Sequence, residues 1–316
     1  MSFSKDVKEE LQRYDTPARH CQLAEFTAIF FLSGKMKKTG RGRYYLEIHT
    51  ENLTVAKKSY MLLRKMFHIS AEVMVRNHNV QGNITNYYII VRNPQEIAMV
   101  LKAVKVLDEF GRVQNTGFAE QKILVQNTCC KRAFLRGAFL VAGSVTDPGK
   151  AYHLEIAVLS REIADELQKM MGFFSLDAKI VQRKKYQVVY LKEGAQIVDF
   201  LNVVEAHQAL MDFENVRIVK EVRNSVNRQV NCETANIHKT VTAAAKQIED
   251  IRYIECNGGL RQLAKGLRQV AELRLDYPDS SLAELGQMLQ PPIGKSGVNH
   301  RLRKLGEIAK QLREHS

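Results

Sequence analysis

A short apolar segment rich in small residues occurs twice, and this duplication constrains the fold more than any other feature of the sequence. The first copy spans residues 26–34 and the second spans residues 134–144. Each copy contains a glycine at its end, Gly34 and Gly143. Apolar runs of this length predict buried helices, and small residues let another helix approach closely. We therefore expect two equivalent helices that pack against each other at the seam between two halves.

The segments that follow each copy repeat in the same order. Leu46-Glu47-Ile48 precedes Leu154-Glu155-Ile156 by 108 positions, and Gly34 precedes Gly143 by 109. Hydrophobic periodicity predicts two αββαββα units with this phasing. In the first unit we expect helices at 21–33, at 52–67 with Asn52 as its N-cap, and at 94–107. We also expect a basic hairpin at 35–43 and strands at 44–49, 71–76 and 86–92, with Leu46 and Ile48 on one face of the first strand. In the second we expect helices at 131–142, 161–171 and 194–204, with strands at 144–146, 152–156, 178–182 and 187–191, the last two joined by a tight basic turn at 183–185.

The rest of the chain is predicted to be helical. Residues 1–20 form an N-terminal helix, followed by the repeats at 21–113 and 128–213. Residues 214–233 mix asparagine with arginine and lysine, which indicates a linker. It leads into a helix from about Thr234 to Ile254, which Asn257-Gly258-Gly259 ends, at the start of a helical domain at 234–316. Further helices are expected at 260–275, 281–289 and 296–313. The predicted fold class is α+β, with the duplicated domain followed by an all-α domain.

Residues 277–310 have the pattern of a helix-turn-helix. Ser281 and Glu284 suit a capping box, and Pro291-Pro292 must end the first helix. The second helix turns Val298, Leu302, Leu305 and Ile308 inward. Its other face, near its N-terminus, can read bases in the major groove, because arginine and asparagine pair with guanine and adenine edges. The candidate DNA-binding residues are Lys295, Ser296, Asn299, His300, Arg301, Arg303 and Lys304. The alternative is a solvated basic face on a bundle helix.

The charge balance points to a polyanionic partner. The formal net charge is +13 and the pI is about 9.5. Such a surplus favours nucleic acid first and an anionic membrane surface second. More than half of the surplus lies in residues 1–213, so the duplicated domain is expected to add phosphate contacts. The candidates are Lys37, Lys38, Arg41, Arg43, Arg183, Lys184 and Lys185. No apolar run approaches the roughly 20 residues of a membrane span.

The cysteines predict neither a disulfide framework nor a cofactor. There are five, with no C-x-x-C spacing, which argues against a zinc site and favours a reducing cytoplasm. The adjacent pair Cys129-Cys130 suits either a redox role or burial as small apolar residues at a helix start. We expect no bound metal and no cofactor.

The duplicated units, each opened by an apolar helix ending in Gly34 or Gly143, resemble the LAGLIDADG homing endonucleases. With the C-terminal Ser281–Gly286 and Lys295–Leu302 segments added, the whole chain resembles the WhiA family of bacterial regulators. Homing endonucleases of this type hold a catalytic metal through an acidic residue just before the final glycine of each motif. That position here is Ser33 in the first copy and Ala142 in the second. The resemblance thus implies a retained binding scaffold without nuclease chemistry.

The resemblance implies a non-catalytic, nucleoid-associated protein that binds double-stranded DNA. Its relatives act as transcription regulators in sporulation, and influence cell division and chromosome segregation. Two alternatives stay open. One is a protein that binds the division, segregation or transcription machinery and uses DNA as an anchor. The other is a metal-dependent endonuclease with a rebuilt site, for which Asp147 and Glu155 are the available carboxylates.

Overall fold

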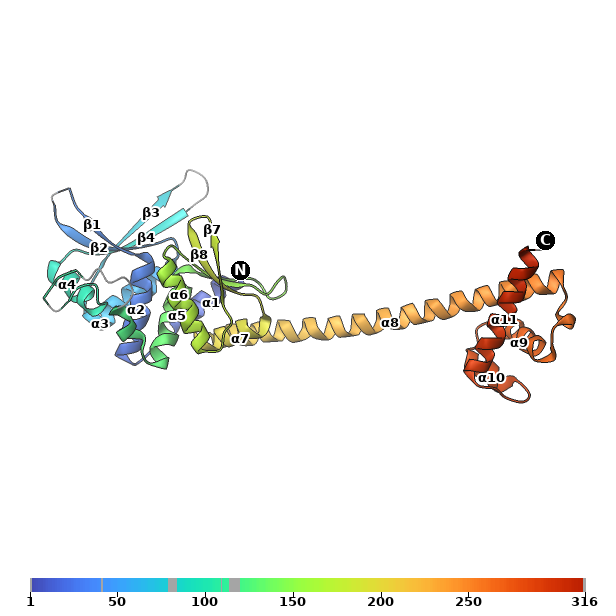
Figure 1. The fold of residues 1–316 in the computed structure, drawn as a ribbon. Helices are drawn as coiled ribbons and strands as arrows, with labels where there is room; N and C mark the ends of the chain where they lie inside the picture. The colour runs from blue at the N-terminus through green and yellow to red at the C-terminus, as the bar shows by residue number, and fades with distance from the viewer. Residues whose placement is uncertain (1, 41, 79–83, 109, 114–119, 315–316) are drawn as a thin grey trace. The chain divides into compact units, whose positions relative to one another are not determined.

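The computed structural model describes residues 2–40, 42–78, 84–108, 110–113 and 120–314 (Figure 1). The chain divides into two compact units, Met1–Glu221 and Val222–Ser316. The first unit holds both repeats and the second holds the helix-turn-helix segment. Among the described residues, no helix is both long enough and apolar enough to cross a membrane.

The two repeats have the predicted order of elements. After the N-terminal helix α1 (Phe3–Arg13), the first repeat comprises α2 (Arg19–Ser33), β1 (Gly34–Lys38), β2 (Tyr44–Thr50), α3 (Leu53–Phe67), β3 (Glu72–His78), β4 (Ile84–Val91) and α4 (Pro94–Ala103). The second comprises α5 (Thr128–Ala142), β5 (Gly143–Val145), β6 (Leu154–Val158), α6 (Arg161–Phe173), β7 (Lys179–Arg183), β8 (Tyr186–Leu191) and α7 (Gly194–Val203). A short 3-10 helix, η1 (Glu120–Val125), precedes α5.

Each repeat builds one four-stranded antiparallel sheet, and the two sheets have the same topology. The strand orders are β1-β2-β4-β3 and β5-β6-β8-β7. The registers also match, because Gly34 pairs with Ile48 in the first sheet and Gly143 with Ile156 in the second. The predicted α+β class with a duplicated domain is therefore confirmed.

Local sequence explains why the elements begin where they do. Asn52 accepts a hydrogen bond from the Thr54 amide 2.8 Å away and caps α3, as predicted. Asn93 caps α4 in the same way, ahead of Pro94 in the first turn. Both side chains satisfy amide groups that the first helical turn leaves without partners.

Helices α2 and α5 pack directly against each other and form the seam between the repeats (Figure 1). Both are buried along most of their length. A Cβ atom on Gly137 would overlap the Glu25 carbonyl oxygen and lie 3.0 Å from the Ala28 Cβ. The two backbones meet so closely here that only glycine fits at position 137.

A buried network of charged side chains crosses the same seam. Arg136 on α5 lies 3.3 Å from Glu25 on α2, and both side chains are 1% exposed. Lys58 on α3 lies 3.2 Å from the other Glu25 oxygen, and Glu205 pairs with the opposite side of the Arg136 guanidinium. Burial by itself would lower the pKa of Arg136, but the two carboxylates outweigh it and raise the pKa. The charges are thus mutually neutralised inside the core.

The predicted linker is helical instead. Residues 214–233 lie within α8 (His207–Asn257), so the helix begins at His207 rather than near Thr234. No glycine or proline occurs between residues 207 and 257, and asparagine alone lowers helix propensity without ending a helix. The helix ends at Asn257, three residues beyond the predicted Ile254. The predicted glycine stop is present, since Gly259 adopts a φ of 74° and its amide donates to the Ile254 carbonyl at 2.9 Å.

The second unit has its own small core. After α8 come the 3-10 helix η2 (Leu260–Gln262), α9 (Lys265–Asp276), α10 (Leu282–Met288) and α11 (Lys295–Glu314). The single helix expected at 260–275 is therefore broken between η2 and α9. The core joins these helices through buried apolar side chains, including Ile251, Ile254, Val270, Leu285, Val298 and Leu302.

Candidate nucleic-acid interface

The first helix of the helix-turn-helix, α10, begins with the predicted capping box. The Ser281 hydroxyl accepts from the Glu284 amide at 3.3 Å, and the Glu284 carboxylate accepts from the Ser281 amide at 2.7 Å. These hydrogen bonds to the charged form lower the pKa of Glu284. Arg274, on the preceding helix, is 2% exposed and donates to the carbonyls of Pro278 and Ser280, which fixes the loop that leads into α10.

The turn between α10 and α11 depends on a close backbone approach. The Ile293 amide donates to the Gly286 carbonyl at 3.0 Å. A Cβ on Gly286 would overlap the Ile293 carbonyl oxygen. Glycine at position 286 therefore allows the chain to fold back and start α11 against α10.

Helix α11 has the two faces that the sequence predicted. Val298, Leu302 and Leu305 are at most 3% exposed, and Ile308 packs against the same core. Most candidate DNA-binding side chains lie exposed on the opposite side, at the N-terminal half of the helix: Lys295, Ser296, Asn299, His300, Arg303 and Lys304. The surface combines four basic or imidazole groups with an amide and a hydroxyl, the groups that contact phosphates and base edges.

Arg301 differs from the other candidates. It is only partly exposed, and its guanidinium donates to the Gly266 carbonyl on α9 at 3.3 Å. The expected outward position is therefore corrected: Arg301 connects α11 to α9. Arg313 near the other end of α11 pairs with Asp250 of α8 at 2.8 Å. These two contacts hold the second helix in place relative to the rest of its unit.

In the duplicated domain, two of the predicted phosphate-contact residues are already paired. Lys37 lies 2.6 Å from Glu47, and Arg183 lies 2.9 Å from Glu155. Glu47 and Glu155 occupy equivalent positions in the two repeats, but the cation that pairs with them comes from β1 in the first repeat and from β7 in the second. Lys38, Arg43, Lys184 and Lys185 are exposed, whereas Arg41 lies outside the described residues. The predicted tight turn at Lys184-Lys185 is confirmed, with a φ of 53° at Lys184.

Aromatic and basic side chains lie together on the face of the first sheet that turns away from the helices. His49 stacks on Tyr88 with 4.7 Å between ring centroids, and the Arg76 guanidinium lies 5.4 Å from the same Tyr88 ring. The strand alternation could have revealed this face, because His49 follows the inward-facing Ile48 by one position. Stacked aromatic and basic groups of this kind suit contact with nucleic acid.

The residues at the ends of α2 and α5 do not fit a magnesium site. Ser33 is half-buried, and its hydroxyl donates to the Ile29 carbonyl at 2.6 Å. Ala142 has no oxygen in its side chain. A cavity of about 780 Å³ opens beside them, and its carboxylates, Glu9 and Glu51, come from α1 and the segment before α3 rather than from these helices. Magnesium is held mainly by carboxylate oxygens, and neither Ser33 nor Ala142 supplies a carboxylate.

The fold and this helix pair define the class of protein: a LAGLIDADG-like domain without the motif carboxylates, joined to a helix-turn-helix domain. Three family descriptions match consecutive parts of the chain. They are the WhiA N-terminal LAGLIDADG-like domain at residues 19–107, the WhiA LAGLIDADG-like domain at 131–223 and the WhiA C-terminal HTH domain at 226–309. The chain belongs to the WhiA family.

Full-length relatives agree with this membership. A protein named probable cell division protein WhiA from Lachnoclostridium phytofermentans is 52% identical over 99% of this chain and 100% of its own length. A protein of the same name from Alkaliphilus metalliredigens is 46% identical over the full length of both. The crystal structure of full-length WhiA from Thermatoga maritima is similar in fold, with a TM-score of 0.59 at 25% identity, covering 98% of this chain and 99% of that one.

Proposed function

We propose that this protein is a non-catalytic, site-specific DNA-binding regulator that reads bases with the N-terminal half of α11. The observation that carries the proposal is the exposed set Asn299, His300 and Arg303 on a helix held rigidly by its capped partner α10. A helix presented in this way enters the major groove of double-stranded DNA and contacts base edges with its first turns. The amides near Ser296 would bind a phosphate at the helix N-terminus.

The duplicated domain would add affinity without sequence information. Lys38, Arg43, Lys184 and Lys185 are exposed and suited to phosphate contacts. Lys37 and Arg183 would instead screen the carboxylates of Glu47 and Glu155, which otherwise would repel the DNA backbone. Phosphate contacts of this kind supply most of the salt-dependent part of the binding free energy.

The nuclease alternative is disfavoured by the residues themselves. Glu155, a carboxylate that a rebuilt site would need, pairs with both Arg183 and His153. Glu25 is buried between Lys58 and Arg136. A plasmid that carries the bound sequence should therefore stay intact in magnesium or manganese. Specific cleavage would overturn the non-catalytic assignment.

The biological role proposed is transcription regulation connected with cell division, chromosome segregation and, where it occurs, sporulation, in the nucleoid of the cytoplasm. Support comes from relatives named probable cell division proteins and from the helix-turn-helix domain. Mapping the bound genomic sites, with transcript levels measured beside them, tests this role. Variants that lose DNA binding but still complement a deletion strain would assign the role to a protein partner instead.

The direct test replaces Asn299, His300 and Arg303 with alanine. Each lost base contact should weaken specific binding by about 1–3 kcal/mol, which is roughly 5- to 150-fold per contact. The matched control is Lys310→Ala, an exposed basic residue near the C-terminal end of the same helix. Binding is measured by fluorescence anisotropy at fixed salt, and unchanged discrimination against a scrambled site would refute base readout by α11.

The second test replaces Lys184 and Lys185 with glutamine. If both contact phosphates, the slope of log K against log salt should fall by about 0.9 for each lost contact. Lys57→Gln serves as control, because Lys57 is exposed on α3, in the helical layer of the same unit. An unchanged slope would remove this turn from the DNA interface.

A further inference from the structure

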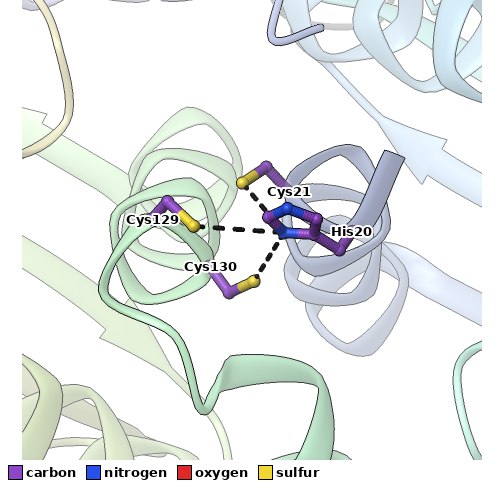
Figure 2. A group of neighbouring side chains, drawn as sticks. All are labelled: His20, Cys21, Cys129 and Cys130. Carbon is purple, nitrogen blue, oxygen red and sulfur yellow. Dashed lines mark hydrogen bonds between the residues drawn. The ribbon is translucent and has the colours of Figure 1, made fainter. Parts of the chain in front are cut away.

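Three cysteines and a histidine gather where α2 and α5 begin (Figure 2). His20 and Cys21 lie in the first turn of α2, and Cys129 and Cys130 lie in the first turn of α5. Figure 2 shows the two pairs facing each other across the gap between the helices, with the His20 ring directed toward all three sulfur atoms. The cluster is at the opposite end of these helices from Ser33 and Ala142.

The four donor atoms are close enough to share one ion. The His20 Nδ1 lies 3.2 Å from the Cys130 sulfur, 3.3 Å from the Cys21 sulfur and 4.0 Å from the Cys129 sulfur. All four donor atoms lie within 4.8 Å of one another. In a tetrahedral zinc site with Zn–S of about 2.3 Å and Zn–N of about 2.0 Å, neighbouring donors are roughly 3.5–3.8 Å apart. Small rotations of the side chains would suffice to reach that geometry.

The chemistry of the donors selects the metal. Three thiolates and one imidazole are the ligands of a structural Cys₃His zinc site, whereas magnesium and calcium require oxygen donors. No carboxylate belongs to this group. With four protein ligands the site would be closed, which is typical of a structural rather than a catalytic ion.

The surroundings suit an ion that arrives from solvent. His20 and Cys129 are exposed, while Cys21 and Cys130 are buried. Burial and the neighbouring thiols raise the pKa of Cys21 to about 12, and burial also raises the pKa of Cys130, so these two thiols are protonated when no cation is bound. A divalent cation would displace these protons, because the thiolate and not the thiol is the metal ligand.

The complex would carry one net negative charge, which its position favours. The N-terminal ends of α2 and α5 have no side-chain cap, and their positive dipole ends stabilise negative charge. Arg19 precedes His20, and Lys131 and Arg132 follow Cys130. These basic groups belong to the same helical turns as the ligands.

The duplication explains how the cluster arises. His20 precedes Cys129, and Cys21 precedes Cys130, by the same 109 positions that separate Gly34 from Gly143. The symmetry that brings the two helices together therefore brings equivalent residues of both together. A bound ion would link the two repeats at this end of the seam, as the Arg136–Glu25 pair links them further along.

We propose that His20, Cys21, Cys129 and Cys130 bind one structural zinc ion that joins the two repeats. Binding replaces the three thiol protons by one Zn²⁺, so up to three protons are released and no electron is transferred. Nothing in this step requires an oxidant or DNA, and the proposal is independent of the function assigned to α11.

The experiment uses the full chain, purified without a polyhistidine tag under reducing conditions. Zinc content is measured by plasma mass spectrometry, and the metal-free protein is titrated with Co²⁺. We expect one zinc per chain, and a thiolate-to-cobalt charge-transfer band with the visible absorption of a tetrahedral ion. Both should be lost in Cys129→Ser and in His20→Ala, variants of exposed residues that keep the apolar core intact. The control Cys232→Ser/Cys256→Ser removes two exposed cysteines of the second unit and should retain both signals.

Stability supplies a second readout. Zinc should raise the Tm of the first unit in the wild type and in the control variant, but not in Cys129→Ser. The proposal is overturned if the reduced chain gives no thiolate–cobalt band, or if the band survives in Cys129→Ser and His20→Ala. A disulfide between Cys21 and Cys129 or Cys130 that persists in protein purified under reducing conditions, as mapped by mass spectrometry, would also overturn it.

Discussion

Gly137 offers the sharpest test of the packing at the seam, because helix propensity and tertiary structure predict opposite effects for the same substitution. In an unpacked helix, Gly→Ala stabilises by up to about 1 kcal/mol. At position 137 the added methyl would overlap the Glu25 carbonyl oxygen and press on the Ala28 side chain. Overpacking of a core costs about 1–3 kcal/mol, so Gly137→Ala should be destabilising.

Gly172 is the matched control. It also lies in a helix, α6, but a Cβ there meets no atom within 4 Å. Gly172→Ala should therefore be neutral or stabilising by up to about 1 kcal/mol. Both variants add the same methyl group, so a difference in their stability reports the contact with the neighbouring helix at position 137.

The assay is thermal unfolding followed by tyrosine fluorescence. The chain has no tryptophan and eleven tyrosines, of which only Tyr253 and Tyr277 lie in the second unit, so the signal reports on the first unit. For a unit of this size, 1 kcal/mol corresponds to about 2–4 °C in Tm. Gly137→Ala should lower Tm by at least that amount, whereas Gly172→Ala should not. A Gly137→Ala protein as stable as the wild type would refute the close approach of α2 and α5.

Two further predictions concern pH. Burial lowers the pKa of Lys8 from its ordinary 10.5 to about 8 in the folded protein. Below pH 8 the folded protein must bury a charged lysine, which destabilises it, and this cost disappears as the pH rises from 8 to 10.5. Lys8→Met should raise Tm at pH 7, and a gain that does not shrink above pH 8 would contradict this. The hydrogen bonds from Ser281 lower the pKa of Glu284 below its ordinary 4.5. The charged Glu284 therefore stabilises the folded second unit above pH 4.5, and this stabilisation is lost as the pH falls through the lowered pKa. In Glu284→Gln, the stability of the second unit, measured by circular dichroism, should fall less steeply as the pH is lowered. An unchanged pH dependence would contradict the capping box.

Local signals made much of the architecture predictable. The alternation of Leu46 and Ile48, the cap at Asn52 and the box at Ser281 and Glu284 depend on residues a few positions apart, and all three were confirmed. The predicted linker at 214–233 was wrong, because asparagine weakens a helix without ending it, and residues 207–257 contain no glycine or proline.

The sites were harder to predict, because their partners lie far apart along the chain. The sequence predicts phosphate contacts for Lys37 and Arg183, but Glu47 on the neighbouring strand pairs with Lys37, and Glu155, two strands away in its sheet, pairs with Arg183. Arg301 was predicted to contact bases, but its guanidinium donates to the Gly266 carbonyl on another helix. Composition and spacing identify the charge of a side chain and not its neighbour.

By itself, the sequence determined the duplicated units, the exposed polar face of α11 and the loss of both motif carboxylates at Ser33 and Ala142. Only the tertiary structure decided which of these groups meet. Two pairs of adjacent residues, each unremarkable in its own segment, become a Cys₃His cluster because α2 and α5 pack with their N-terminal ends together. That packing depends on the close backbone approach that glycine permits at position 137. The small residues of the two segments predict such an approach, but not which side chains at the helix N-termini it brings together.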